Sequence, residues 1–481
     1  MSRWKVLFLF VLEIATEMFS EDIYRYTVLS HFPSPNNSFR TRWQIDRKMS
    51  IILLFLISPL IFCFTYLSMF GMPHFKYGMT VPEQSVHRAI LYSSSQNMSH
   101  HPWDFHLKTH KHYAVKGYKL VCYYSLPSSS DSLQVEDIDP FLCTHLNVAF
   151  ATVVNNTAYL DEKQKDYLKK LLELKQSNEN LKVLVSVGGA GNIGGFPEMV
   201  ANHTNRKTFI QSVIHYVKNY GIDGVDLDWE FPNEEPGKDK IQRVHFTQLL
   251  EEFRKSINRE PHFPYILSVS VAAPAAIIDN SYDVAYINEY VDFINVMSYD
   301  YHFYTKVTPF TGINSPLYTA DNEKYYLSTL NINYSVNYWN YLGVERHKIN
   351  VGLPTYGHTF RLINPSNNGT YAPSLGYGKL GKQGFVSYPQ ICQFLSSNQI
   401  TPVFDMETKS PYASKYYEWI SFDNSQSLIY KAEYIRDNNF GGAMVWSLNS
   451  DDYKGICKDE QGGVSKFTLI RNIKKVLQGE S

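Results

Sequence analysis

GIDGVDLDWEFP, residues 221–232, is the part of the chain that we expect the rest of the fold to position. Acidic and apolar residues alternate strictly in its second half, which is the period of a β-strand. The acidic residues Asp226, Asp228 and Glu230 therefore lie on one face of the predicted strand, and the apolar residues between them lie on the other. Asp223 stands at the entry to the strand, and we assign it a structural role.

Three carboxyl groups on one face of a strand are close enough to influence one another. Neighbouring members of the row would lie about 6.5 Å apart, twice the rise per residue. All three cannot ionise comfortably in a shielded cleft, so we predict that one of them holds a proton near neutral pH. A protonated carboxyl beside ionised ones is the arrangement that donates a proton to a leaving oxygen, as in glycosidases.

The acidic row has two alternative interpretations. Charges in a strand usually form the solvated face of an outer strand, but here the opposite face carries Trp229 and the row ends in Phe231-Pro232. A calcium loop of the EF-hand type needs a glycine at its sixth position and mostly polar spacers, and neither is present. We therefore predict no metal site here.

The pattern Asp-Gly-x-Asp-x-Asp-x-Glu, residues 223–230, resembles the signature of glycoside hydrolase family 18, which contains the chitinases and the chitinase-like lectins. The resemblance continues in order over residues 118–457. Five further motifs carry it: Ser186-Val187-Gly188-Gly189, Met297-Ser298-Tyr299-Asp300, Asn314-Ser315-Pro316-Leu317-Tyr318, Pro354-Thr355-Tyr356-Gly357 and Gly441-Gly442-Ala443-Met444-Val445-Trp446.

Short apolar segments alternate with amphipathic ones over the same part of the chain. The predicted strands lie near residues 118–124, 145–151, 181–187, 224–229, 266–272, 293–298, 349–353 and 442–447. The clearest predicted helices are 164–174, 206–219, 242–257 and 426–436. Eight strands that alternate with helices predict a parallel, closed (β/α)8 TIM barrel over residues 117–478, with its chemistry at the C-terminal ends of the strands.

The interval between the seventh and eighth strands is too long for a simple crossover. Residues 361–420 contain segments rich in Asn, Gly, Pro and Tyr. They resemble the small α+β insertion that deepens the cleft in the longer chitinases.

The N-terminal part of the chain differs in character from the predicted barrel. Residues 1–48 have no periodic pattern, and we expect them to be cytoplasmic. Residues 49–71 contain about twenty apolar residues without a charge behind a basic flank, which predicts a transmembrane signal anchor and an extracellular or lumenal barrel. The alternative is synthesis from Met49 with a cleaved signal peptide and a secreted protein. Residues 72–116 are rich in His, Ser and Pro and are predicted to form a stem or linker.

Cysteine usage is consistent with an oxidising compartment. Of the five cysteines, Cys63 falls in the apolar segment, which leaves an even set of four. The resemblance implies that Cys122 pairs with Cys143 and that Cys392 pairs with Cys457. The sequence contains no Cys-x-x-Cys spacing, so it does not indicate a structural zinc site. Sequons compatible with N-glycosylation stand at Asn97, Asn155, Asn202, Asn333 and Asn368.

The resemblance also implies a mechanism in which the substrate, not the protein, supplies the nucleophile. Glu230 would be the general acid that protonates the glycosidic oxygen and later activates water. Asp228 would orient the acetamido group of the sugar, and Asp226 would share a proton or hydrogen bond with Asp228. Tyr299 would hydrogen-bond the acetamide.

Further residues are assigned to substrate binding by the same resemblance. Asp300 and Tyr356 would hold neighbouring sugar groups, and the aromatic face of Trp446 would lie beneath the distorted sugar. Taken singly, such aromatic residues are more often part of a core. The full set implied is Tyr123, Gly189, Phe231, Met297, Asp300, Tyr356 and Trp446.

The chain departs from the active chitinase pattern around this centre. Ala190 and Ser125 stand where the family commonly has tryptophan, and His358 stands where arginine is usual. The tryptophan expected after Tyr299-Asp300 is also missing, with Tyr304 the nearest substitute. We therefore expect hydrolysis of short or soluble N-acetylglucosamine oligomers rather than of crystalline chitin.

Three classes of function remain after these observations. The preferred one is a chitin-type glycosidase without a cofactor, acting as a monomer on N-acetylglucosamine oligosaccharides. The second is a chitinase-like lectin that binds sugar or a protein partner, although such relatives usually replace the acid that Glu230 provides. The third is a membrane-tethered scaffold. The net charge of −1 argues against binding to nucleic acid.

Overall fold

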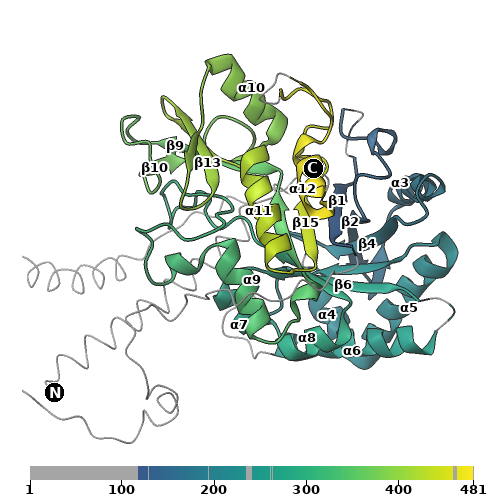
Figure 1. Ribbon diagram of the computed structural model, residues 1–481. Helices are drawn as coiled ribbons and strands as arrows, with labels where there is room; N and C mark the ends of the chain where they lie inside the picture. The colour runs from purple at the N-terminus through teal and green to yellow at the C-terminus, as the bar shows by residue number, and fades with distance from the viewer. Residues whose placement is uncertain are drawn as a thin grey trace, which may run out of the picture. The chain divides into compact units, whose positions relative to one another are not determined.

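The computed structural model describes residues 117–479, apart from 128, 130, 193, 234–240, 261, 263 and 459–462 (Figure 1). The predicted cytoplasmic segment, signal anchor and stem, residues 1–48, 49–71 and 72–116, lie outside the described residues. Within the described part of the chain, no helix combines the length and the apolar character that a membrane span requires.

Eight parallel strands close into a barrel, as the alternation of segments predicts. Their hydrogen-bonded order is β1-β15-β8-β7-β6-β5-β4-β2, and pairing of β1 with β2 completes the ring. The short strand β3 (Thr157–Tyr159) adds an antiparallel edge to β2. The barrel strands are β1 (Lys119–Ser125), β2 (His145–Val154), β4 (Lys182–Gly188), β5 (Gly224–Asp228), β6 (Ile266–Ala272), β7 (Phe293–Met297), β8 (Ile349–Pro354) and β15 (Gly442–Trp446).

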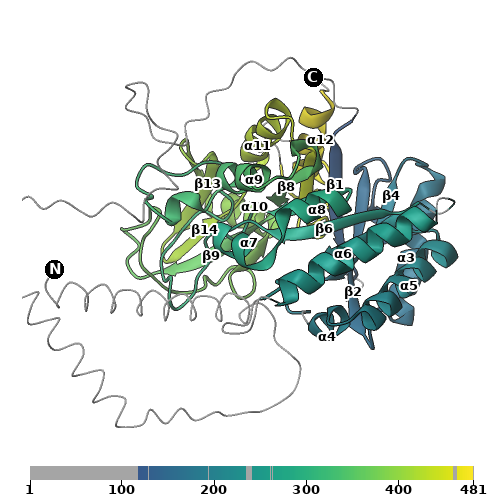
Figure 2. The ribbon, with the colours of Figure 1, turned by 90° about the horizontal axis from the view of Figure 1, so that it is seen from below.

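Helices cover the outside of this barrel, and the four that the sequence predicts are all present. Figure 2 shows α3, α5 and α6 gathered on the side of the barrel where β2 and β4 lie. The helices are α3 (Glu162–Glu173), α4 (Phe196–Val200), α5 (His203–Tyr220), α6 (Ile241–Arg259), α7 (Ala275–Ser281), α8 (Val284–Tyr290), α9 (Ile332–Tyr341), α11 (Ser425–Asp437) and α12 (Thr468–Gln478). In its described residues, the connection from β1 to β2 carries only a short 3-10 turn, η1 (Val135–Asp137).

Local capping explains where the helix before the acidic strand begins and ends. Asn202 caps α5 by accepting a hydrogen bond from the amide of Asn205 at 3.0 Å. Gly221 ends α5 with φ of 77°, a left-handed conformation that glycine adopts without strain. The chain then enters β5, so the boundary between helix and strand lies where the sequence places it.

The predicted insertion is a second, antiparallel sheet between β8 and α11. Its order is β10-β9-β14-β13-β12, with β11 paired to β9. The sheet runs from Tyr356 to Ser421, a wider range than the 361–420 expected, because its first strand begins directly after β8. Its elements are β9 (Tyr356–Leu362), β10 (Ser374–Gly376), β11 (Phe385–Ser387), α10 (Tyr388–Asn398), β12 (Val403–Asp405), β13 (Ser410–Lys415) and β14 (Glu418–Ser421).

Strand β5 is buried on both of its faces. Val225 and Leu227 point into the core between the barrel and its helices and are 0% exposed. Trp229 continues this outer face, stacked on Phe196 at 5.2 Å and in edge contact with Phe246 at 5.8 Å. The acidic face must therefore point into the barrel, because successive side chains of a strand alternate.

Both disulfides implied by the resemblance are present. Cys122 in β1 is bonded to Cys143, just before β2, with a Cα–Cα distance of 6.2 Å. Cys392 in α10 is bonded to Cys457, beyond β15, with a Cα–Cα distance of 5.5 Å. The second bond ties the insertion to the last part of the barrel.

Candidate active site

The acidic row lies at the C-terminal end of β5, as predicted. Asp226 is 0% exposed and Asp228 is 4% exposed, whereas Glu230 stands beyond the strand and is half-buried. The three carboxyls therefore run from the barrel interior toward its mouth.

Asp226 is held by donors from four other segments of the barrel wall. Its Oδ2 accepts hydrogen bonds from the Tyr123 hydroxyl at 2.6 Å and the Ser186 hydroxyl at 2.8 Å. Its Oδ1 accepts one from the Ser268 hydroxyl at 2.7 Å. Longer bonds come from Ser270 at 3.3 Å and Asn295 at 3.3 Å. We call Asp226 and these five donors the floor, a set that suits a carboxylate, which only accepts.

Most of the floor was missed by the sequence reasoning. The resemblance assigns Tyr123 to substrate binding, which stays a prediction; in the structure Tyr123 is 1% exposed and its hydroxyl donates to Asp226. Ser268 and Ser270 alternate with valines in a strand that is otherwise apolar, and Asn295 interrupts another. Polar residues at alternate positions of a buried strand were the available signal.

Asp228 is the carboxyl whose environment most favours a proton. Burial raises its pKa well above the usual value, and the neighbouring charges of Glu230 and Asp226 raise it further. Its Oδ1 is buried without a hydrogen-bond partner in the protein. Asp228 is therefore the member of the row whose protonated form the fold favours, and a proton held near neutral pH stays a prediction.

Tyr299 follows β7 and faces the acidic row. Burial raises the pKa of its phenol well above the usual value, and the carboxyls of Asp228 and Asp300 add to the effect. The ring meets that of Tyr356 edge to face, with centroids 6.0 Å apart. Tyr299 is thus a neutral hydroxyl donor at the mouth of the barrel.

A second cluster, which we call the rim, consists of Asp300, Tyr356 and His358. One oxygen of Asp300, Oδ1, lies 2.5 Å from the Tyr356 hydroxyl and 2.6 Å from His358 Nε2. Asp300 has φ of 58°, a left-handed conformation uncommon for aspartate, and its amide donates to Asn314 Oδ1 at 2.9 Å. His358, at the position where the resemblance implies arginine, contacts the Asp300 carboxylate.

An aromatic group lies opposite the acidic row. Trp446 at the end of β15 is half-buried and stacks on Phe150 with centroids 5.5 Å apart. The Tyr123 ring is 5.4 Å from Trp446. Phe150 was not predicted, and its position at the C-terminal part of the second strand was the only signal for it.

Gly189 and its neighbour Gly188 matter because they have no side chain, which lets other parts of the site come close to their backbone. A Cβ atom at Gly189 would lie 2.4 Å from the Phe150 ring, and one at Gly188 would lie 2.1 Å from the carbonyl oxygen of Asp228. Both glycines also have positive φ, 116° at Gly188 and 83° at Gly189. The end of β4 can therefore approach the acidic strand only as glycine.

Two other predicted binding residues lie among apolar neighbours. Met297 packs with the interior cluster that contains Met444 and Tyr299. Phe231 is half-buried and packs against the core between barrel and helices. Their role in substrate binding stays a prediction.

In the described part of the chain, no group of three acidic, His or Cys side chains is arranged to hold a metal ion.

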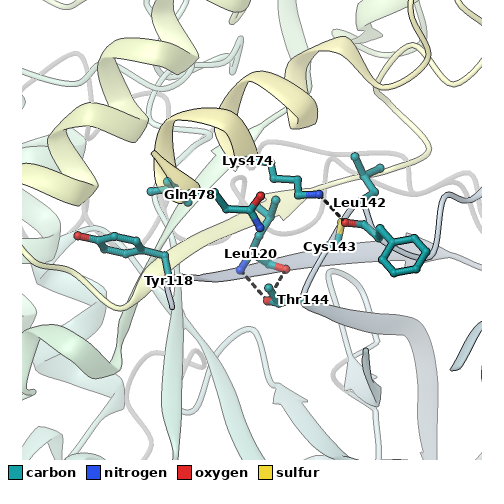
Figure 3. A pocket seen from close by; sticks show the side chains of 9 residues that line it. Tyr118, Leu120, Leu142, Cys143, Thr144, Lys474 and Gln478 are labelled. Atoms are coloured by element: carbon teal, nitrogen blue, oxygen red, sulfur yellow. Dashed lines mark hydrogen bonds between the residues drawn. The ribbon is translucent and has the colours of Figure 1, made fainter. Parts of the chain in front are cut away.

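A small pocket lies at the opposite end of the barrel, around the starts of β1 and β2 (Figure 3). It is bordered by Tyr118, Leu120, Thr144 and the end of α12, where Lys474 donates to the carbonyl of Phe141 at 2.9 Å. None of the predicted catalytic or substrate-binding residues lines it.

Comparison with known proteins gives one family. The model of the glycosyl hydrolases family 18 matches residues 119–451. Human chitinase-3-like protein 2 is 36% identical over 374 residues, which cover 75% of this chain and 93% of that protein. Mouse chitotriosidase-1 is 35% identical over 374 residues, covering 75% of this chain and 78% of that protein.

A solved structure of human YKL-39 is similar over the same part of the chain. It has 34% sequence identity and a TM-score of 0.69, and it covers 75% of this chain and 100% of that one. That protein is described as a pseudo-chitinase with retained chitooligosaccharide binding properties. The chain is thus similar both to a protein named as an enzyme and to one described as a pseudo-enzyme.

Proposed function

The chain belongs to the glycosyl hydrolases family 18, and on that premise we propose that it hydrolyses β-1,4-linked N-acetylglucosamine oligomers. The reaction would proceed with retention of configuration and with help from the acetamido group of the substrate. Residues 117–478 would form the catalytic unit. The observation that carries this proposal is the intact acidic row, in which Glu230 lies at the mouth and the buried Asp228, whose pKa is raised, lies deeper in the barrel.

In the first step, Glu230 gives its proton to the glycosidic oxygen as the bond from that oxygen to the anomeric carbon breaks. The carbonyl oxygen of the acetamido group forms a bond to the same carbon from the opposite side. Asp228 hydrogen-bonds the amide of this group and stabilises its positive charge, and Tyr299 orients the acetamide. In the second step, Glu230 takes a proton from water, whose oxygen bonds to the anomeric carbon as the bond from that carbon to the acetamido oxygen breaks.

Asp226 lies deeper in the barrel than Asp228 and acts on the substrate through it. The five donors of the floor hold its charge in place beside Asp228. A negative charge next to Asp228 disfavours a second one, so a proton shared by the two carboxyls lies on Asp228 in the free protein and shifts toward Asp226 as the acetamido group gains positive charge.

The surroundings of the acidic row favour short substrates. Trp446 offers an aromatic face beneath the reacting sugar, and the rim offers polar groups to its neighbours. Ala190 provides no stacking surface. Tyr304 is held at the insertion, where its ring meets Tyr377 at 5.4 Å and its hydroxyl donates to the carbonyl of Leu375 at 3.3 Å. Soluble oligomers that need few stacking contacts fit this site better than crystalline chitin.

The second candidate function is binding of chitooligosaccharides without cleavage. The similarity to human YKL-39, described as a pseudo-chitinase, favours it. The two functions share the same aromatic face and rim, and they differ only in whether Glu230 turns substrate over.

We also propose that the barrel folds in an oxidising compartment, supported by its two disulfides. The chain would reach that compartment either through a signal anchor at 49–71 or as a secreted protein.

The decisive experiment is hydrolysis of a fluorogenic chitotrioside by the disulfide-bonded full chain, its Glu230→Gln variant and a matched Glu198→Gln variant. Glu198 is exposed on α4, so its loss should leave activity unchanged. Release that Glu230→Gln abolishes and Glu198→Gln retains supports the glycosidase. A folded wild type that binds the oligosaccharide in calorimetry but releases no fluorophore would instead establish the lectin.

A further inference from the structure

Four N-glycosylation sequons lie in the described part of the chain, and they occupy different structural settings. They begin at Asn155, Asn202, Asn333 and Asn368. A glycan is bulky and hydrophilic, so the folded protein must present its asparagine to solvent. We propose that Asn155, Asn202 and Asn368 carry N-linked glycans and that Asn333 does not.

The chemistry of the modification places a simple demand on each site. The side-chain Nδ2 forms a bond to the anomeric carbon of a lipid-linked oligosaccharide, the bond from that carbon to the lipid pyrophosphate breaks, and the amide loses one proton. The modified side chain keeps its Oδ1 acceptor and one N–H donor. A compatible site therefore needs an exposed Nδ2 and only bonds that this reduced amide still makes.

Asn155 is exposed at the tip of a hairpin. It and Asn156 join β2 to β3, with φ of 48° and 59°. The strands pair from Val154 to Thr157, so the two asparagines form a tight two-residue turn. The amide of Asn155 can carry a glycan without disturbing the strands behind it.

Asn202 and Asn368 are exposed and make bonds that glycosylation preserves. Asn202 caps α5 through Oδ1, the atom that the glycan leaves unchanged. Asn368 donates from Nδ2 to the Ser414 hydroxyl at 3.1 Å, which the remaining N–H can continue to do. Its carbonyl accepts from Trp419 Nε1 at 2.9 Å, so the backbone there is anchored independently of the amide.

Asn333 lies in a different environment. It belongs to the first turn of α9 and contacts Tyr434 of α11, and the two helices lie side by side in Figure 1. Its half-buried Oδ1 accepts from the Tyr434 hydroxyl at 2.8 Å and from Asn337 Nδ2 at 3.1 Å. Tyr434 is only 7% exposed. Asn333 is therefore only partly accessible to solvent, whereas the other three asparagines are exposed.

The third residue of this sequon is closed to solvent as well. Ser335 is 0% exposed, and its hydroxyl accepts from Tyr301 at 2.7 Å. If folding precedes transfer, the transferase cannot reach this hydroxyl. If transfer comes first, the glycan must be accommodated on a half-buried side chain whose Oδ1 is engaged by Tyr434. Both orders place a demand on Asn333 that the three exposed sites do not meet.

The test is site-by-site occupancy in the full chain produced by a secreting eukaryotic cell. After both disulfides are verified, the protein is deglycosylated enzymatically in ¹⁸O water, and the labelled aspartates are located by peptide mass spectrometry. A sample without the enzyme corrects for spontaneous deamidation. We expect label at 155, 202 and 368 and none at 333. Label at 333 to a similar extent, or its absence at any of the other three, would overturn the proposal.

A pair of variants gives an independent readout. Thr204→Ala removes the sequon at Asn202 but keeps the helix cap, so it should lower the apparent mass by one glycan. Asn333→Asp removes the other sequon but keeps the acceptor for Tyr434 and Asn337, so it should leave the mass unchanged. A mass loss with Asn333→Asp, or none with Thr204→Ala, contradicts the assignment. These readouts do not depend on catalysis, so they stand apart from the test of hydrolysis.

Discussion

The floor of the site takes its donors from β1, β4, β6 and β7, whereas the rim joins one residue after β7 to two residues of the insertion strand β9. Every residue of the floor is buried in a regular strand. Asp300, by contrast, keeps 36% of its side chain exposed. The floor is built to hold a charge in one geometry, whereas the rim presents a partly exposed carboxylate. Substitutions in the floor should therefore alter the chemical step, and substitutions in the rim should alter substrate preference.

The largest effect should follow from Asp228→Asn. The variant keeps the size of the side chain but loses the exchangeable proton beside Glu230, so kcat for the chitotrioside should fall by about 10² to 10⁴. Steady-state kinetics beside Glu198→Gln would measure this. A loss of less than about tenfold would mean that Asp228 takes no part in the chemical step.

The same variant should alter how stability depends on pH. Since burial raises the pKa of Asp228 above its ordinary value near 4, the folded state keeps a proton that the unfolded chain releases above about pH 4. Wild-type stability therefore falls as pH rises toward the raised pKa, by up to about 1.4 kcal/mol per pH unit from this group.

Asparagine has no proton to release, so Asp228→Asn should remove this contribution. The free energy of unfolding of the variant minus that of the wild type, measured in urea, should increase as pH rises above about 4. A difference that stays constant with pH would show that Asp228 ionises in the folded protein much as it does in the unfolded chain.

A smaller effect is expected from the donors of the floor. Ser268→Ala removes the 2.7 Å bond to Asp226 Oδ1, and a buried bond to a charged group contributes about 1.5 to 3 kcal/mol. Urea unfolding should show a loss of this order together with reduced kcat. Ser397→Ala, at an exposed position on α10, is the control and should change neither quantity. Equal effects of the two variants would remove the distinction between floor and surface.

The smallest effect should come from restoring a stacking surface. Ala190→Trp adds an aromatic face at a half-buried position after β4, worth about 1 kcal/mol to a stacked ring. That corresponds to about a fivefold lower Kd, expected for a long oligomer and not for the trioside. Calorimetry with both sugars on the Glu230→Gln background measures it. Equal gains for both lengths would argue against the idea that the outer contacts are weak.

The strand and helix patterns predicted the barrel well because each depends on local spacing. The period of two around Asp226 and Asp228 placed both side chains on one face, and β5 has them there. The bounds of the insertion were less accurate. Tyr356 and Gly357 read as the end of a barrel motif, whereas they are already in β9 and pair with β11. One residue separates the two sheets, and no local pattern marks so short a boundary.

The sequence by itself determined the family, the ring of strands, the order of the acidic row and the residues that form the two disulfides. Only the tertiary structure decided what surrounds each carboxyl. Ser186, Ser268 and Asn295 stand far from Asp226 in the chain, yet closure of the barrel brings their side chains to its two oxygens. The state of Asp228 likewise depends on burial and on neighbouring charges, which are properties of the packed interior. Spacing along the chain reveals which face a residue occupies, but the energy of a charge depends on everything that the fold places around it.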